Sequence, residues 1–392
     1  MLRISRRILF LLVIPLIAAT AVQAEVPADS LRVEQPDSAS SSHGFLSSVI
    51  AYFANANKKA PGRTPDFSFI GGPHYSSDTG FGIGLMAAGI YSTSPSDPGV
   101  LPSNISVFAD ATTGRFFKVG VGGTHIYHRG DRRVSYEVSF QSFTTYFWGI
   151  GYDAGHRPDN KSKYQLLDVD VTADHLWRLS GPFFAGPLAE ISYIRAKHIK
   201  VLRTWQGVPR HTLSAGVGLR LQFDTRDNLT APRRGWLGRI DQTVYPRFIG
   251  NGRRSFGSTE VSVAHYASVW EGGVIASRLH GCFTYGRTPW GMMPTVGGRS
   301  VMRGYYEGQY RDKCETDIIV ELRQKVAGRS GVAVWGALGA VYPDFSGFRG
   351  RYFLPNCGVG YRWEFKKDTN VRLDVGIGKG CWGLEFNINE AF

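Results

Sequence analysis

Alternation of apolar and polar residues with a period of two runs from Asp66 to the C-terminal Phe392, and it limits what this chain can fold into. In NVRLDVGIG (370–378) an arginine and an aspartate alternate with four apolar residues, and GVGYRWEF (358–365) repeats the pattern. Successive side chains of a β-strand point to opposite faces of the sheet, so the pattern predicts strands with one apolar and one polar face. Counting such segments gives about sixteen antiparallel strands, with about 20 residues for each strand and its turn.

A soluble β-sandwich would show the same alternation, but other features favour a membrane barrel. Glycine makes up 48 of the 392 residues and aromatics 13%, against an ordinary glycine share of about 7%. Trp and Tyr cluster near strand ends, as an interfacial girdle requires, and the polar faces carry glycine or charge. Short links such as WEGGV alternate with long ones such as GIGYDAGHRPDNKSK. These features predict an all-β, 16-stranded antiparallel transmembrane β-barrel over residues 65–392 of the chain.

The N-terminal residues predict export. Residues 1–24 combine three arginines, an apolar run and small residues at the cleavage spacing, and therefore read as a signal peptide cut near Ala24. The alternative, a membrane anchor, would need about 20 apolar residues, which is more than this run provides. Residues 25–44 are rich in Ser, Pro and acids and predict a disordered linker. Residues 45–59 have apolar residues at helical spacing and predict a short amphipathic helix.

The net charge and the four cysteines limit which partners and which cellular compartment fit this chain. The formal net charge is +13, of which the leader contributes three arginines and no acid. A basic balance often indicates nucleic acid, but export argues against it and favours a cationic lumen or loops near anionic lipids. Four cysteines in an oxidising compartment allow three disulfide pairings. Cys314 and Cys381, both expected near the outer rim, make the favoured pair.

The chain ends in CWGLEFNINEAF, an alternating run that closes on an aromatic residue. In this run one parity is shared by Trp382, Leu384, Phe386, Ile388 and Phe392. A terminal Phe behind such a run resembles the signal that the barrel-assembly machinery reads on its clients. We therefore expect that machinery to insert this protein.

Four motifs, in order along the chain, carry a more specific resemblance. GGPHYSSDTGFGIG (71–84) resembles an opening hairpin, LQFDTRDNLTAPRRGW (221–236) a periplasmic turn, and VGYRWEF followed by VRLDVGIG the penultimate strands. The fourth motif, VGGRSVMRGYYEGQYRDK (296–313), resembles the RG(F/Y) loop of the BamA/TamA superfamily, also called the bacterial surface antigen family. The resemblance implies sixteen strands and a long sixth outer loop that folds back into the lumen.

The resemblance assigns roles to the residues of the loop motif. A guanidinium inside a barrel needs an acidic partner, because a poorly hydrated charge is costly unless it is paired. Asp374 and Glu321 are the favoured partners of Arg303, and two further acids expected to face the lumen, Glu364 and Glu385, are also candidate partners. Glycine permits a sharp turn close to the wall, and the two tyrosines are expected to pack the loop tip against it. The motif residues are Gly297, Gly298, Arg303, Gly304, Tyr305 and Tyr306.

Two further sets of residues follow from the resemblance. The periplasmic turn motif comprises Asp224, Arg226, Asp227, Pro232 and Gly235. The first and last strands are expected to meet in a weak lateral seam, because glycines and a proline reduce strand pairing. The seam glycines are Gly71, Gly72 and Gly383.

The sequence departs from the superfamily pattern in two places. The thirteenth strand usually carries an Asp in a Phe-x-Asp-x-Gly pattern facing the loop arginine, whereas WGALG (335–339) places Ala337 there. The region before Asp66 also resembles the short members that lack the amino-terminal POTRA domains.

No pattern predicts catalysis, a cofactor or a metal. GKGCWG (378–383) matches GxGxxG but is followed by a strand, and no GxSxG occurs. His125 and His128 would face opposite sides of a strand. The expected function is assembly or translocation of proteins or lipids at the outer membrane of a Gram-negative cell, and the alternative is a non-insertase pore or structural barrel in a larger complex. Expected partners are outer-membrane lipids including lipopolysaccharide, and either client outer-membrane proteins or a periplasmic partner.

Overall fold

The computed structural model describes residues 62–76, 80–97, 99–249, 255–298, 301–366 and 369–392. The predicted signal peptide (1–24), linker (25–44) and helix (45–59) lie outside the described residues. No helix within those ranges is long and apolar enough to cross a membrane.

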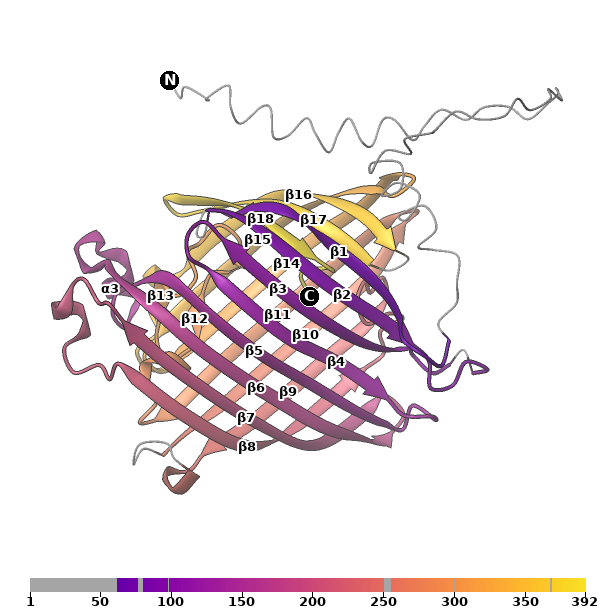
Figure 1. Ribbon diagram of the computed structural model, residues 1–392, viewed down its shortest axis with the longest axis horizontal. Coiled ribbons are helices and arrows are strands. Elements are labelled where there is room, and N and C mark those ends of the chain that lie inside the picture. Colours follow the sequence, from indigo (N-terminus) through magenta and orange to yellow (C-terminus); the bar gives the residue numbers. More distant parts are fainter. Residues whose placement is uncertain (1–61, 77–79, 98, 250–254, 299–300, 367–368) are drawn as a thin grey trace, which may run out of the picture. The chain divides into compact units, whose positions relative to one another are not determined.

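A single antiparallel sheet of sixteen strands, each paired with its neighbour in the chain, accounts for most of the described residues (Figure 1). The number of strands predicted from the sequence is therefore confirmed, and a two-layer sandwich is excluded for these residues. The strands are β1 (Asp66–Ser76), β2 (Gly80–Tyr91), β3 (Ser103–Thr112), β4 (Phe117–Ile126), β5 (Arg132–Phe147), β6 (Ser162–Ser180), β7 (Phe183–Lys197), β8 (His211–Asp224), β9 (Gly235–Tyr245), β10 (Phe256–Trp270), β11 (Gly273–Gly286), β14 (Cys314–Ala327), β15 (Ser330–Tyr342), β16 (Leu354–Lys366), β17 (Thr369–Gly378) and β18 (Cys381–Ile388).

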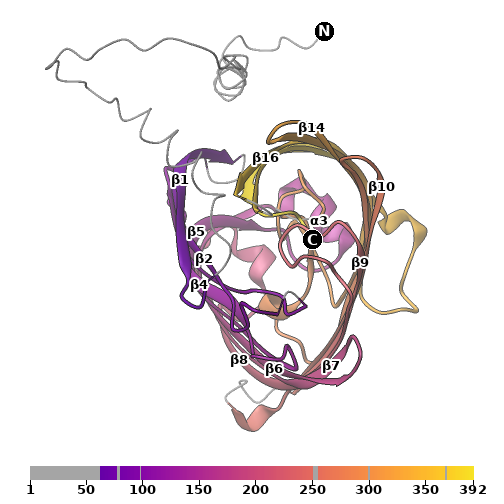
Figure 2. The same cartoon turned by 90° about the vertical axis from the view of Figure 1, so that its right-hand side faces the viewer.

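The sheet curls so that its two edge strands, β1 and β18, approach each other (Figure 2). The hydrogen-bonded order of the sheet begins at β1 and ends at β18. We call this junction the seam.

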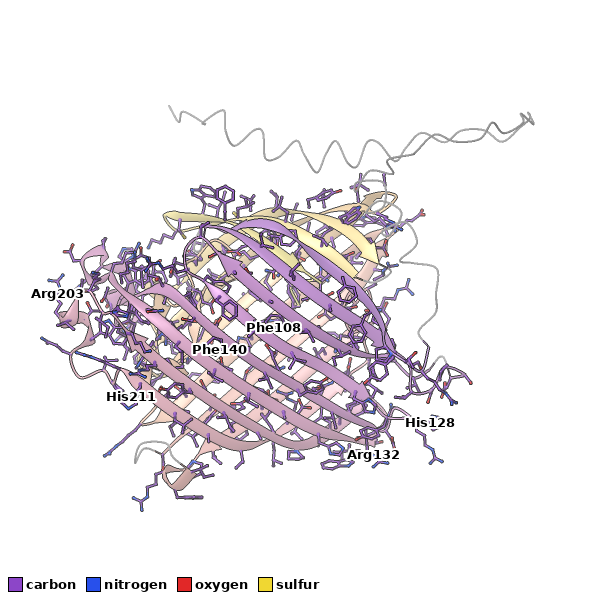
Figure 3. All side chains as sticks on the ribbon, viewed as in Figure 1. Phe108, His128, Arg132, Phe140, Arg203 and His211 are labelled. Atoms are coloured by element: carbon purple, nitrogen blue, oxygen red, sulfur yellow. The ribbon has the colours of Figure 1, made fainter. Side chains whose placement is uncertain are left out.

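Loop lengths differ between the two ends of the strands. Links 181–182, 271–272 and 328–329 are two residues long, whereas links at the other end hold short elements: α3 (Tyr152–His156), η1 (Pro158–Asn160), η2 (Leu202–Trp205), η3 (Arg247–Ile249), η4 (Trp290–Met292), β12 (Thr295–Val296), β13 (Tyr310–Arg311) and η5 (Gly350–Tyr352). Figure 3 shows Arg203 and His211 at this long-loop end, and His128 and Arg132 at the short-turn end. The predicted asymmetry holds for these links but not for all: 379–380, at the long-loop end, has two residues, whereas 92–102 and 225–234, at the short-turn end, have eleven and ten.

The two faces of the sheet differ as the alternation predicts. The loop between β11 and β14 lies on the concave side (Figure 2), and there it contacts Glu321 and Asp374. On the same strands Val320 and Ile377, with the opposite parity, are exposed. The convex face therefore presents a broad band of exposed apolar side chains, including Leu85, Leu219, Val334, Val359 and Trp382. Exposed apolar surface of this extent is typical of a protein surrounded by lipid.

The C-terminal residue does not continue the alternation of the last strand. Asn389 has a φ of 65°, a left-handed conformation, and β18 ends one residue before it. The chain then turns to the concave side, where the Phe392 ring packs against Tyr266 and Arg323. Phe392 therefore does not share the convex face with the exposed Trp382, because the period of two stops where the strand stops.

The favoured disulfide is absent as well. None of the four cysteines, each among the described residues, forms a disulfide. Cys314 begins β14 and Cys381 begins β18, with three strands between them in the sheet. Neighbouring strands are about 4.8 Å apart, so this separation exceeds the reach of a disulfide.

Candidate functional site

The β11–β14 loop (287–313; 299 and 300 are outside the described residues) is anchored on the concave face by its arginine. Arg303 is 0% exposed. Its Nη1 donates to Asp374 Oδ2 at 2.8 Å, and its Nη2 donates to Glu321 Oε2. The structure thus brings the loop arginine together with the two acids that the sequence favours.

Further arginines make this an arginine–carboxylate cluster. Arg362 donates to Asp374 Oδ1 at 2.5 Å, and Arg372 donates to Asp374 Oδ2 at 2.7 Å. Arg323 Nε donates to Glu321 Oε1 at 2.7 Å. These charges are buried, and buried charges persist only when they are paired. The cluster comprises Arg303, Arg323, Arg362, Arg372, Glu321, Asp374 and Glu390.

The other two predicted acids occupy different positions. Glu385 is buried directly across the ladder from Asp374, and so belongs to the same region of the wall. Glu364 lies near the short-turn end of β16 and pairs with Lys325 at 3.1 Å instead. The assignment of Glu364 to the loop arginine is therefore wrong, because parity along a strand fixes the face of a residue but not its height.

An aromatic ring and an amide complete the arginine site. The Arg303 guanidinium carbon lies 3.6 Å from the centre of the Trp335 ring, a cation–π contact. Trp335 Nε1 donates to Asn356 Oδ1 at 2.9 Å, and Asn356 Nδ2 donates to the Arg303 carbonyl at 2.6 Å. Sequence reasoning assigned no role to Trp335 or Asn356, since only the pairing of β15 with β16 brings them beside the loop.

Three glycines of the sheet leave room for the backbone of the loop to approach the strands. Gly358, Gly376 and Gly383 lie in one register row with Trp335 across β15–β18. A Cβ on Gly376 would stand 2.0 Å from the Arg303 carbonyl oxygen, and one on Gly383 would stand 3.0 Å from Gly304 Cα. We call this row the glycine shelf. Gly383, predicted as a seam residue, therefore also supports the loop.

The loop itself needs glycine at the point of contact. Gly304 has a φ of 100°, and a Cβ there would lie 2.4 Å from the Gly376 carbonyl oxygen. Gly297 and Gly298 also have positive φ values, of 112° and 102°, and Gly298 N donates to the Tyr305 carbonyl at 3.4 Å. These residues close the loop so that it lies flat on the shelf.

The two motif tyrosines contact different walls. The Tyr305 hydroxyl donates to the Pro355 carbonyl of β16 at 2.8 Å and accepts from Lys379 N at 2.8 Å. Burial raises the pKa of the Tyr305 phenol, which keeps it a donor. The Tyr306 hydroxyl lies 3.0 Å from Thr145 Oγ1 of β5. The loop therefore connects β5 to the β16–β18 side of the sheet.

The periplasmic-turn motif forms a compact turn between β8 and β9. Buried Asp224 accepts from Arg133 Nη1 at 2.7 Å and from Arg226 Nε at 3.0 Å. Asp227 Oδ1 accepts from the backbone N of Arg233 at 2.9 Å. Gly235 has a φ of 105°, and a Cβ there would lie 2.2 Å from the Thr225 carbonyl. The remaining motif residue, Pro232, is buried at this turn.

The two predicted seam glycines of β1 are paired with β2. Gly71 pairs with Leu85, and Gly72 pairs with Gly84, so neither interrupts the ladder between β1 and β2. A Cβ on Gly71 would stand 2.4 Å from the Leu85 side chain. These glycines therefore allow close packing within the first hairpin.

Comparison with known proteins supports the fold. No family model and no curated protein matches the sequence. The chain is similar to the crystal structure of BamA from Haemophilus ducreyi lacking POTRA domains 1–3, with 12% identity, 83% of this chain and 70% of that chain covered, and a TM-score of 0.51. It is also similar to CdiB from Acinetobacter baumannii (12% identity; 84% and 66% covered; TM-score 0.50) and to CdiB from Escherichia coli (13%; 86% and 69%; 0.51).

At such low identity the similarity concerns the fold alone. The resemblance to the BamA/TamA superfamily, predicted from four motifs, is therefore confirmed at the level of the fold.

Proposed function

We propose that this protein is an outer-membrane β-barrel of the BamA/TamA superfamily that assembles or translocates proteins or lipids at its seam. The observation that carries the proposal is that β1 and β18, the first and last strands of the hydrogen-bonded order, lie beside each other, next to a loop fixed to the last two strands. If β1 and β18 move apart, their edges expose backbone donors and acceptors, and such edges act as templates for an incoming strand.

The two faces of the sheet fit this role. The apolar convex face would contact outer-membrane lipids, including lipopolysaccharide, and the charged concave face would line a closed lumen. The β11–β14 loop would then be the sixth outer loop, folded inward. In this proposal the protein is exported, inserted by the barrel-assembly machinery and carries out no enzymatic reaction.

The loop is placed where it can influence the seam. Gly304 lies against Gly383 of β18, which is the edge strand itself, and Arg303 holds Asp374 on β17. Any movement of β18 away from β17 would therefore disturb the loop contacts. We infer that the loop keeps the last strand in position until a client strand, or a periplasmic partner, replaces it.

The test is to lock the seam covalently. The four native cysteines are first replaced by serine. One cysteine is then introduced on each strand, at Phe67 or Phe69 of β1 and at Trp382, Leu384 or Phe386 of β18, so that a disulfide can join the two strands. We expect the locked proteins to fail to complement depletion of the wild-type protein, and reductant to restore function.

The matched control locks two strands that are already paired. Val334 and Val359 face each other in the β15–β16 ladder, and both are exposed on the convex face. A disulfide there should leave function unchanged. Full function of a seam-locked protein would contradict the proposal.

Depletion followed by an outer-membrane proteome separates the proposal from its alternative. Broad loss of outer-membrane barrels is the result expected of an assembly factor. Loss of one partner alone would instead favour a non-insertase barrel that serves as an accessory subunit of a larger complex.

A further inference from the structure

A second cluster of ionisable side chains lies on β10, β11 and β14, outside the loop site. His280 of β11 faces Glu315 and Asp317 of β14 through Nδ1, at 3.1 Å from Glu315 Oε2 and 3.2 Å from Asp317 Oδ2. Through Nε2 the same ring faces Glu260 Oε1 of β10 at 3.3 Å. Both carboxylates of β14 are buried.

The donor atoms of His280, Glu315 and Asp317 all lie within 4.8 Å of one another. Zn²⁺ bonds to imidazole nitrogen and carboxylate oxygen are about 2.0–2.2 Å long, so neighbouring ligand atoms of a tetrahedral site lie about 3.4 Å apart. The two distances from Nδ1 match this value closely. An ion between the three atoms would therefore need little rearrangement of the strands.

Hydrogen bonding alone leaves this cluster incompletely satisfied. Nδ1 can carry one proton, yet it faces two carboxylate oxygens. Asp317 Oδ1 is buried and has no hydrogen-bond partner within the described part of the chain. A cation bound at Nδ1 would satisfy both facing oxygens at once, and Oδ1 would be available as a further ligand.

The opposite side of the imidazole shows the support that metal-binding histidines require. A histidine that binds a metal through one nitrogen generally donates its other N–H to a carboxylate, which fixes the ring. Glu260 occupies that position, and Arg239 Nη2 holds Glu260 Oε1 at 2.5 Å. Glu260 also lines a cavity of about 540 Å³.

The local charge permits a divalent cation. Arg278 Nη2 lies 3.3 Å from Asp317 Oδ2 and is the cation nearest to the pair of carboxylates. With a neutral imidazole, the two carboxylates and this guanidinium sum to one negative charge. From this geometry we propose that His280, Glu315 and Asp317 bind a zinc-type divalent metal ion, with Glu260 as a positioning residue. The ion would tie β11 to β14 on the concave face.

The test uses the tag-free, full-length protein in detergent, stripped with a chelator and titrated with Zn²⁺ by calorimetry. We expect one ion per chain, and Co²⁺ in place of Zn²⁺ should give visible absorption bands. His280→Ala should abolish binding. Glu260→Gln should weaken binding about 10- to 100-fold without abolishing it, because it acts through the ring.

The control is His265→Ala on the convex face of β10, where the ring stacks on Trp236. It removes a histidine without touching the cluster and should leave binding unchanged. The Glu260→Gln protein covers the case in which His280→Ala does not fold. No uptake of either ion by the wild-type protein, or equal affinity in the wild-type and Glu260→Gln proteins, would overturn the proposal and leave a histidinium held by carboxylates.

Discussion

Removal of the loop arginine's charge tests how the loop is held. Arg303→Met keeps an apolar stem against Trp335 but leaves Glu321 and Asp374 with one cation fewer. Breaking a buried pair on one side costs about 3–5 kcal/mol, because the remaining charge stays buried. Here Arg362 still pairs with Asp374, so we expect a loss at the lower end of this range. The free energy of unfolding should fall by about 3 kcal/mol, which lowers the folding equilibrium constant roughly a hundredfold.

The assay is equilibrium unfolding by denaturant in lipid vesicles, followed by tryptophan fluorescence. Glu321→Gln in the Arg303→Met protein restores the charge balance, so the double variant should be more stable than the sum of the single effects by about 1–3 kcal/mol. Arg203→Ala, in the long loop between β7 and β8, is the control and should change stability by less than about 0.5 kcal/mol. Two results would refute the idea that ion pairs hold the loop: additive effects of the two single substitutions, or a change in the free energy of unfolding below about 0.5 kcal/mol for Arg303→Met.

Three further predictions concern the loop glycine, the turn and the C-terminus. Gly304→Ala adds a Cβ at a φ of 100° and against a backbone oxygen, so it should destabilise the protein by about 1–3 kcal/mol, whereas Gly336→Ala, in open space, should be neutral in the same unfolding assay. Asp227→Ala removes the acceptor of the Arg233 amide and should lower stability by about 1 kcal/mol, measured by the denaturant midpoint. Deletion of Phe392 should reduce the fraction of protein that reaches the folded, heat-modifiable form on gels, both because the predicted assembly signal is lost and because its ring packs on the concave face.

The sequence could predict the sheet and the face of each charged residue, because a period of two determines both. Glu321 and Asp374 were identified in this way, and both contact the loop arginine. Parity carries no information on height along a strand, which is why Glu364 was assigned to the same arginine although it pairs with Lys325.

Contacts between strands were harder to predict. Trp335 and Asn356 meet only through the β15–β16 register, and the ligands of the proposed metal site come from two neighbouring strands. The sequence offered His125 and His128 as the histidines to weigh, because they are close along the chain. His280 lies 35 residues from Glu315, so no spacing rule within one strand could connect them.

The loop arginine is held although Ala337 stands where the thirteenth strand usually carries an acid. That strand, β15, contributes the Trp335 ring, which contacts the Arg303 guanidinium, while the carboxylates come from β14 and β17. The loop is thereby fixed to the end of the sheet nearest the seam, with its backbone on the glycine shelf. Since β18 carries one glycine of that shelf, displacement of the loop and movement of the last strand are mechanically linked. In the proposed function, the charge of Arg303 would in this way control whether β18 can move away from its place in the sheet.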